Sequence, residues 1–316
     1  MSTYSDKLKI FAGNSHPALA EDICEYLGTE LLDARAKRFA DGEVSVEINE
    51  TVRGADVFII QPTSPPVNEN IMELLVIVDA LRRASARRIT AVVPYYGYAR
   101  QDRKAKPRDP ITAKLIANIL TAAGARRLLS IDLHAPQIQG FFDIPVDNLY
   151  AAPLMIDYFN KKDLDQLTAV APDVGSVKRV RSIAETLNIP MSIIDKRRPK
   201  PNVAEVMHVV GQSNIEDSNV ILFDDIIDTG GTITQAANAL KENGAKKVFA
   251  CASHGLFSGP AIERLENSVI DEVIVTDSIP QKHSEGLDNL TVLSLAPLVG
   301  EAIDRIFKDL SVSVLF

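Results

Sequence analysis

The stretch Asn219–Ala252, NVILFDDIIDTGGTITQAANALKENGAKKVFACA, indicates the fold of this chain. It begins with a short apolar run, Val220–Phe223, and ends with a second one, Val248–Ala252. Between them, Thr232–Asn243 has apolar residues at spacings of three and four, which is the helical period. A buried strand, a helix and a second buried strand are typical of a parallel sheet covered by helices.

The same order of elements occurs earlier in the chain, in Asp56–Val93, DVFIIQPTSPPVNENIMELLVIVDALRRASARRITAVV. There the strands Val57–Ile60 and Ile89–Val93 flank the helical stretch Glu69–Ser85. Both copies also carry a basic pair before the second strand, so two similar domains that arose by duplication are the simplest explanation. We predict an α/β fold of two tandem domains, residues 1–150 and 151–316, each a mostly parallel sheet flanked by helices. Further expected elements are the strands Leu128–Ile131 and Val273–Val275 and the helices Thr112–Ala123 and Val177–Leu187.

Length and composition agree with this organisation. The 316 residues fit a prior of about 150 residues per domain. Apolar residues make up 46% of the chain and no run approaches the roughly 18 residues of a membrane span. The absence of a secretion signal predicts a cytoplasmic protein whose two cysteines are free thiols. The net charge of −8 argues against binding to nucleic acid or to a membrane surface.

The loop in the second copy carries the sharpest chemical signal. Two adjacent carboxylates, Asp224 and Asp225, follow the apolar run at the end where parallel sheets bind ligands. Glycines let the backbone approach an anion, threonine hydroxyls can donate to it, and the following helix offers N–H groups. Carboxylates suit sugar hydroxyls or a metal, so the pattern favours a ribose 5-phosphate moiety over a simple capped turn with solvated aspartates. The phosphate-binding residues would be Asp228, Thr229, Gly230, Gly231 and Thr232.

Other known phosphate loops do not fit this sequence. It contains neither the G-x-x-x-x-G-K-[ST] pattern nor a G-x-G-x-x-G pattern. Taken alone, the basic residues near Arg100, the acidic turn near Asp41 and the cationic run near Lys196 are equally typical of solvated surface loops. Taken alone, His134 is more often a packed or solvated histidine than a metal ligand.

The segment Val220–Ile233 resembles the phosphoribosyl-diphosphate binding motif of phosphoribosyltransferases and ribose-phosphate pyrophosphokinases. Five further segments resemble the second family, of the phosphate-activated class I, in the expected order from about Leu8 to Phe316. They are FADGE at Phe39–Glu43, YARQDRK at Tyr98–Lys104, DLHAPQIQGFF at Asp132–Phe142, PDVG at Pro172–Gly175 and DKRRPKPN at Asp195–Asn202.

The resemblance implies two phosphoribosyltransferase-like domains and transfer of the diphosphoryl group of ATP to the C1 hydroxyl of ribose 5-phosphate, for nucleotide biosynthesis. It implies that Lys196 and Arg198, on a flexible loop, stabilise the transition state, and that His134 and Asp173 help to bind Mg²⁺. ATP would be bound by Arg100 and Gln101 and, from a neighbouring subunit, by Phe39, Asp41, Gly42 and Glu43. Ribose 5-phosphate would be bound by Arg198, Asp224, Asp225, Asp228, Thr229, Gly230, Gly231 and Thr232.

The resemblance also implies a homohexamer that phosphate activates and ADP inhibits. Arg53, Arg108 and the tail 311–316 match the regulatory regions of relatives. Val314 stands where serine is frequent, and Ser176 where a second glycine is common. Two rival classes share parts of this pattern, a phosphoribosyltransferase and a non-catalytic regulatory relative. The presence of Lys196, Arg198, His134 and Asp173 together favours the enzyme.

The first copy of the repeat has Gln61–Pro66 in place of the aspartate pair and the glycine loop. Its residues can neither bind a diol nor surround a phosphate in the same way. We therefore expect one active site per chain, near the domain interface, with the ribose 5-phosphate loop in the second domain and the first domain supplying contacts to ATP.

Overall fold

The computed structural model describes residues 7–162, 164–197, 206–282, 284 and 286–315. The chain forms two compact units that divide at Tyr150, within the boundary expected from the sequence. The first unit also includes residues 278–280 and the chain from residue 294 onward, which the sequence analysis placed in the second domain. The reason is that the C-terminal helix α8 (Ala296–Phe307) packs against α1 (Pro17–Leu27) of the first unit. None of the described helices is long and apolar enough to cross a membrane.

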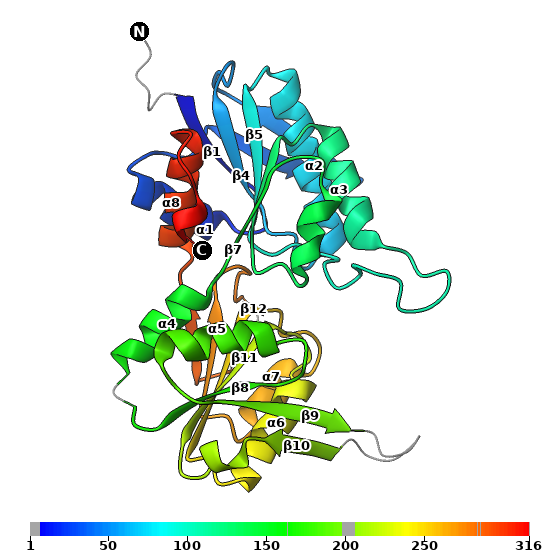
Figure 1. Cartoon of the computed structure of the whole chain (residues 1–316). Helices are drawn as coiled ribbons and strands as arrows, with labels where there is room; N and C mark the ends of the chain where they lie inside the picture. The colour runs from blue at the N-terminus through cyan, green and yellow to red at the C-terminus, as the bar shows by residue number, and fades with distance from the viewer. Residues whose placement is uncertain (1–6, 163, 198–205, 283, 285, 316) are drawn as a thin grey trace. The chain divides into compact units, whose positions relative to one another are not determined.

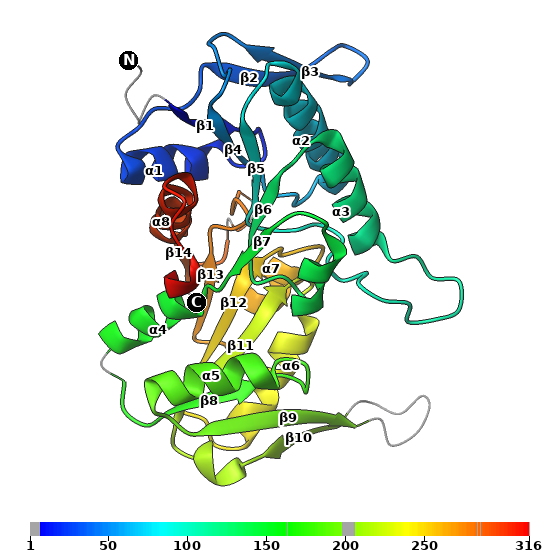
Figure 2. The same ribbon diagram turned by 45° about the horizontal axis from the view of Figure 1, so that its top comes forward.

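The first unit is built on a five-stranded parallel sheet of order β1-β4-β5-β6-β7. Figure 2 shows α1 and α8 on one side of this sheet and α2 (Val67–Arg83) and α3 (Thr112–Ala123) on the other. The central strands are buried on both faces, which explains why they read as continuous apolar runs. The strands are Leu8–Ala12, Asp56–Ile60, Arg88–Val93, Arg127–Ile131 and Val146–Leu149.

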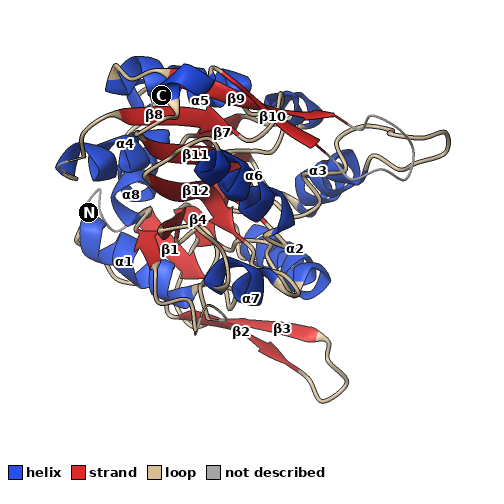
Figure 3. Cartoon of the chain, turned by 90° about the horizontal axis from the view of Figure 1, so that it is seen from below, coloured by secondary structure: helices blue, strands red, loops and turns tan. Residues whose placement is uncertain are grey.

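A separate two-stranded ribbon belongs to the first unit. β2 (Ala34–Arg38) and β3 (Val44–Ile48) pair in antiparallel fashion and extend beyond the main sheet (Figures 2 and 3). The turn between them is the exposed segment 39–43, which the sequence analysis had read as an acidic turn.

The second unit is built on a seven-stranded sheet of order β10-β9-β8-β11-β12-β13-β14; Figure 1 labels β8 to β12, and Figure 2 also labels β13 and β14. All neighbouring strands are parallel except β9 and β10, which form an antiparallel pair at the edge. The strands are Leu167–Ala171 (β8), Met191–Arg197 (β9), Val206–Val210 (β10), Asn219–Ile227 (β11), Lys247–Gly255 (β12), Glu272–Thr276 (β13) and Leu290–Leu293 (β14). The helices are Ala152–Lys161 (α4), Val177–Leu187 (α5), Gly231–Glu242 (α6) and Ala261–Glu266 (α7).

The two copies of the sequence repeat correspond to β4–α2–β5 and β11–α6–β12. The prediction of two parallel α/β units is therefore confirmed. One boundary was wrong: β11 continues to Ile227 instead of ending at Phe223, so Asp224 and Asp225 lie within the strand. The extension exists because β12 is also long and pairs with β11 as far as Gly255.

Of the two parallel sheets in the described part of the chain, the seven-stranded one is the sheet whose order of named strands changes direction. In the second unit the chain runs from β8 to β9 and β10 on one side, and then crosses to β11 on the other side of β8. Ligands bind parallel sheets at such a switch point, beyond the carboxyl ends of the strands. In the first unit β1 lies at an edge and β4 to β7 follow in a single direction. The fold therefore provides this kind of crevice in the second unit, where β8 and β11 end.

Candidate active site

The loop from Asp228 to Gly230 connects β11 to α6 at the switch point. Gly230 has φ +74°, a left-handed conformation that favours glycine, and α6 begins at Gly231. A Cβ atom on Gly230 would lie 3.4 Å from the carbonyl oxygen of Ala261, at the start of α7. The first N–H groups of α6 have no intrahelical acceptor and carry the positive end of the helix dipole. The loop thus has the backbone geometry of an anion site.

The two aspartates of β11 differ in exposure but interact directly. Asp225 is buried, whereas Asp224 is partly exposed. The N–H of Asp225 donates a hydrogen bond of 2.9 Å to a carboxylate oxygen of Asp224. Burial and then the charge of Asp225 raise the pKa of Asp224 well above its usual range, and the charge of Asp173 adds to the shift. The site therefore concentrates negative charge that a hydroxyl donor or a cation would stabilise.

Asp173 lies in the loop that follows β8, next to β11 in the sheet. Ser176 holds this loop in place. Its N–H donates to the Asp173 carboxylate at 3.1 Å, and its hydroxyl donates to the Asp173 carbonyl at 3.0 Å. The structure thus brings Asp173 close to Asp224 and Asp225, where β8 and β11 end.

Arg179 is a cation beside the aspartate pair that the sequence motifs did not indicate. Arg179, in the first turn of α5, places Nη1 at 3.8 Å from a carboxylate oxygen of Asp225. The position of Arg179 in the sequence could have revealed this contact. A basic residue in the first turn of the helix that follows a strand-end loop faces the same crevice as the loop. Arg179 partly balances the charge of the aspartate pair.

The residues expected to contact ATP lie in two exposed loops of the first unit. Arg100 and Gln101 follow β5. The Gln101 side chain accepts a 2.5 Å hydrogen bond from the Thr112 hydroxyl, and its carbonyl accepts one from the Ala113 N–H. This loop is therefore fixed to the start of α3.

The second of these loops is the turn between β2 and β3. Phe39 is 59% exposed, Gly42 has φ +95°, and Asp41 accepts a 3.1 Å hydrogen bond from the Glu43 N–H. The turn is closed by a bond from the Phe39 N–H to the Glu43 carbonyl. It presents an aromatic ring and two carboxylates on a well-defined hairpin end.

The remaining expected residues are distributed over both units. His134 is an exposed residue in the loop after β6 of the first unit, whereas Asp173 belongs to the second. Within the described ranges, no group of three or more histidine, cysteine or acidic side chains has the arrangement of a metal site. Lys196 lies in β9, paired with Met207 of β10, so its backbone is strand instead of the expected loop. Arg198 lies outside the described residues.

The end of β4 in the first unit is occupied by a buried polar network. Gln61 accepts a 2.7 Å hydrogen bond from the Ser15 hydroxyl and donates a 3.0 Å bond to Glu73, a carboxylate that is 1% exposed. A Cβ atom on Gly13 would lie 2.0 Å from the Gln61 amide oxygen, so the glutamine fills the space beside this glycine. The side chains of this network therefore fill the position after β4 that corresponds to the Asp228–Gly230 loop after β11.

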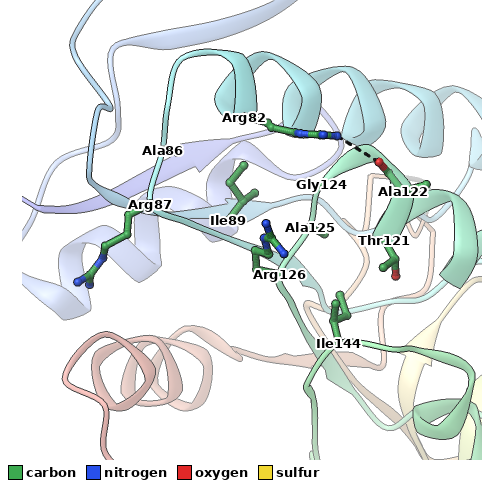
Figure 4. A pocket seen from close by; sticks show the side chains of 10 residues that line it. All are labelled: Arg82, Ala86, Arg87, Ile89, Thr121, Ala122, Gly124, Ala125, Arg126 and Ile144. Atoms are coloured by element: carbon green, nitrogen blue, oxygen red, sulfur yellow. Dashed lines mark hydrogen bonds between the residues drawn. The ribbon is translucent and has the colours of Figure 1, made fainter.

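A cavity of about 260 Å³ in the first unit lies elsewhere. It is lined by Arg82, Arg87 and Arg126, and Figure 4 shows Arg82 reaching the carbonyl oxygen of Ala122 at 3.4 Å. Arg87 and Arg126 directly precede β5 and β6, so the cavity is at the amino ends of the strands. This is the opposite edge from the one at which parallel sheets bind substrates.

The second unit, with its central strand leading through paired carboxylates into an Asp-Thr-Gly-Gly-Thr loop, defines an α/β protein of the class that binds phosphorylated ribose. The family described as the N-terminal domain of ribose phosphate pyrophosphokinase matches residues 8–124. The family described as the phosphoribosyl synthetase-associated domain matches residues 161–316.

Named relatives agree over the whole chain. Ribose-phosphate pyrophosphokinases of Caldanaerobacter subterraneus subsp. tengcongensis and Bacillus caldolyticus are each 57% identical to it, with 100% of both chains covered. The crystal structure of phosphoribosylpyrophosphate synthetase from Mycobacterium smegmatis matches with a TM-score of 0.90 and 43% identity, covering 96% of this chain and 99% of that one.

The chain belongs to the ribose-phosphate pyrophosphokinase family. It is an enzyme, a diphosphotransferase of nucleotide biosynthesis that forms 5-phosphoribosyl 1-diphosphate from ATP and ribose 5-phosphate. The resemblance noted in the sequence is confirmed.

Proposed function

We propose that the loop Asp228–Thr232 binds the 5-phosphate of ribose 5-phosphate, while Asp224 and Asp225 accept hydrogen bonds from its 2- and 3-hydroxyls. The observation that carries this assignment is the position of the loop at the switch point of the second sheet, directly after the carboxylate pair. Helix N-terminal N–H groups suit a phosphate, and carboxylates suit a diol. The C1 hydroxyl would then face the crevice between β8 and β11.

The proposed ATP contacts come from the first domain. Arg100 and Gln101 would bind the nucleotide, and the turn of Phe39, Asp41, Gly42 and Glu43 would reach the site of a neighbouring subunit. Support comes from the exposure of both loops and from the hydrogen bonds that give each a defined shape. An exposed phenylalanine with adjacent carboxylates suits a purine base and a ribose.

Lys196 and Arg198 are proposed to stabilise the charge that develops on the transferred diphosphoryl group. Such transfers depend mainly on positioning and on electrostatic stabilisation, so no covalent intermediate is required. We also assign Arg198 to ribose 5-phosphate binding.

Mg²⁺ is the proposed cofactor, with His134 and Asp173 among its ligands. The acidic edge of the second unit fits a hard divalent cation, because Asp173, Asp224 and Asp225 bring carboxyl oxygens close enough together to interact. When bound with the substrate phosphates, the metal neutralises part of their charge. The hydrogen bonds from Ser176 would hold Asp173 in a fixed orientation for this role.

We further propose a cytoplasmic homohexamer with regulatory phosphate and ADP sites formed by Arg53, Arg108 and the tail 311–316. Family membership supports the hexamer and the regulatory sites, and the two buried free cysteines agree with a cytoplasmic location.

The test of the central proposal is an equilibrium titration combined with an assay of AMP release from ATP. We expect AMP release to depend on ribose 5-phosphate and the titration to give one ribose 5-phosphate site per chain. Two sites per chain would contradict the assignment, because the polar network around Gln61 fills the corresponding edge of the first unit.

A further inference from the structure

A cation outside the predicted site touches the phosphate loop from helix α7. Arg264 donates a hydrogen bond of 3.0 Å from Nη1 to the carbonyl oxygen of Thr229. The same nitrogen would lie 3.3 Å from a Cβ atom placed on Gly231. Arg264 therefore lies directly against both residues that flank Gly230, at the point where the loop becomes helix α6.

The hydrogen bond from Arg264 to the Thr229 carbonyl also orients the N–H group of Gly230, in the same peptide. A trans peptide is planar, and its carbonyl oxygen and the following N–H point in opposite directions. Holding the Thr229 carbonyl toward Arg264 thus directs the Gly230 N–H away from Arg264. Gly230 is in the left-handed region, where glycine has more conformational freedom than other residues. The flanking carbonyls of Asp228 and Gly230 accept hydrogen bonds from the N–H groups of Ser258 and Thr234, and Arg264 supplies the bond to the Thr229 carbonyl between them.

The surroundings of Arg264 agree with a role directed at the loop. Its side chain lines an open groove between α6 and α7 together with Gly231, Thr234 and Asn267. Ala261, one turn earlier on α7, places its carbonyl 3.4 Å from the Cβ position of Gly230. Helix α7 thus supports two successive loop residues. Ala261 packs beside Gly230, and Arg264 donates a charged hydrogen bond to Thr229.

We propose that Arg264 is a positioning residue for the 5-phosphate of ribose 5-phosphate, acting through the Thr229–Gly230 peptide. This inference rests on the proposed function of the loop. Its guanidinium orients the Gly230 N–H toward the phosphate and adds positive potential to the loop, without contacting the reacting C1 hydroxyl. The chemical class recognised is a phosphate monoester.

The test compares Arg264→Ala, Arg264→Lys and the matched control Glu266→Ala, an exposed residue on the same helix. Steady-state kinetics are measured with each substrate varied in turn, together with the Tm. Arg264→Ala should raise the KM for ribose 5-phosphate by about tenfold, the magnitude of one lost hydrogen bond. The KM for ATP and the Tm should stay near those of the wild type. Arg264→Lys, which keeps a charged donor, should recover most of the loss, and Glu266→Ala should change nothing.

The variant Thr232→Ala separates this inference from the function on which it rests. If Thr232→Ala raises the KM for ribose 5-phosphate but Arg264→Ala does not, the role of Arg264 is overturned and the loop assignment stands. If neither variant changes that KM, the loop assignment itself fails and the inference with it. A parallel rise in both KM values with a lower Tm would mean that Arg264 only stabilises the fold, which also overturns the proposal.

Discussion

The backbone N–H of Asp225 donates a 2.9 Å hydrogen bond to the carboxylate of Asp224, so the two aspartates form an interacting pair within β11. This one donor offsets little of the cost of placing two carboxylates side by side at the edge of a sheet. Burial and the charge of Asp225 raise the pKa of Asp224. The substrate-free enzyme therefore carries an electrostatic strain at the position where we propose that the ribose hydroxyls bind.

Asp224→Asn should stabilise the substrate-free protein at pH 8 while abolishing activity. Folded Asp224 holds its proton more tightly than the unfolded chain does. The free energy of unfolding of the wild type therefore falls as the pH rises above the ordinary pKa of 3.8, until the raised pKa is passed. The amide removes this loss, so we expect the variant to have a Tm several degrees higher at pH 8, in EDTA, and a similar Tm at pH 4.

The control for that measurement is Asp288→Asn, which changes an exposed carboxylate of the same unit. It should leave the pH dependence of the Tm unchanged. Identical pH profiles for Asp224→Asn and the wild type would show that Asp224 is not strained in the folded protein.

Ser176→Ala should weaken Mg²⁺ activation. The substitution removes the 3.0 Å bond from the serine hydroxyl to the Asp173 carbonyl and leaves the backbone donor in place. We expect the Mg²⁺ concentration for half-maximal activity to rise about threefold to tenfold, as for lost supporting bonds at metal ligands, with kcat at saturating Mg²⁺ nearly unchanged. Ser182→Ala, on the exposed part of α5, is the control. An unchanged Mg²⁺ requirement would argue against Asp173 as a ligand.

Arg88→Met should destabilise the first unit more than Arg87→Met does. Both arginines pair with Asp56, which is 1% exposed, but Arg88 is less exposed than Arg87, with 34% against 52% of its side chain accessible. Arg88 also pairs with Asp309 beyond α8. We expect losses of about 2 kcal/mol for Arg88→Met and about 1 kcal/mol for Arg87→Met in the free energy of unfolding, measured with a denaturant at pH 7.

The pH dependence gives the same prediction an independent check. Burial opposes ionisation of Asp56, but the hydrogen bonds from Arg87 and Arg88 outweigh it and lower the pKa of Asp56. Its stabilisation is present above the ordinary pKa of 3.8 and is lost as the pH falls through the lowered value. The Tm of the wild type should therefore fall more steeply in acid than that of Arg88→Met. Equal slopes would rule out this ion pair as the cause.

The sequence predicted the parallel α/β units because their central strands are buried on both faces and read as apolar runs. Helices α3 and α5 begin and end at the predicted residues, since their apolar periodicity is strong and glycine or asparagine follows each. The C-terminal helix α8 was assigned to the wrong unit, because its partner α1 lies far away in the sequence and no local pattern records that packing. The ribbon of β2 and β3 was missed because its strands are polar and only partly buried.

The sequence predicted the site residues that are close together in the chain. It did not predict those that the packing of separate helices brings to the site. The residues Asp224–Thr232 lie on one loop and one strand, so their spacing carried the inference. Arg264 and Arg179 reach the same region from α7 and α5, and only the three-dimensional structure shows these contacts. The raised pKa of Asp224 likewise depends on burial and on neighbouring charges that no motif encodes.

Gly230→Ala should raise the KM for ribose 5-phosphate at least tenfold and leave the KM for ATP near its wild-type value. Alanine in the left-handed region costs roughly 1–2 kcal/mol, and here the new methyl group would also lie 3.4 Å from the Ala261 carbonyl. The loop would relieve both by rotating the peptide that we expect to face the phosphate. Gly28→Ala is the matched control, because Gly28 has φ +63° but no atom within 4 Å of its Cβ position. It should lower the Tm and leave both KM values unchanged. If Gly230→Ala changes only the Tm, the loop geometry does not determine phosphate binding.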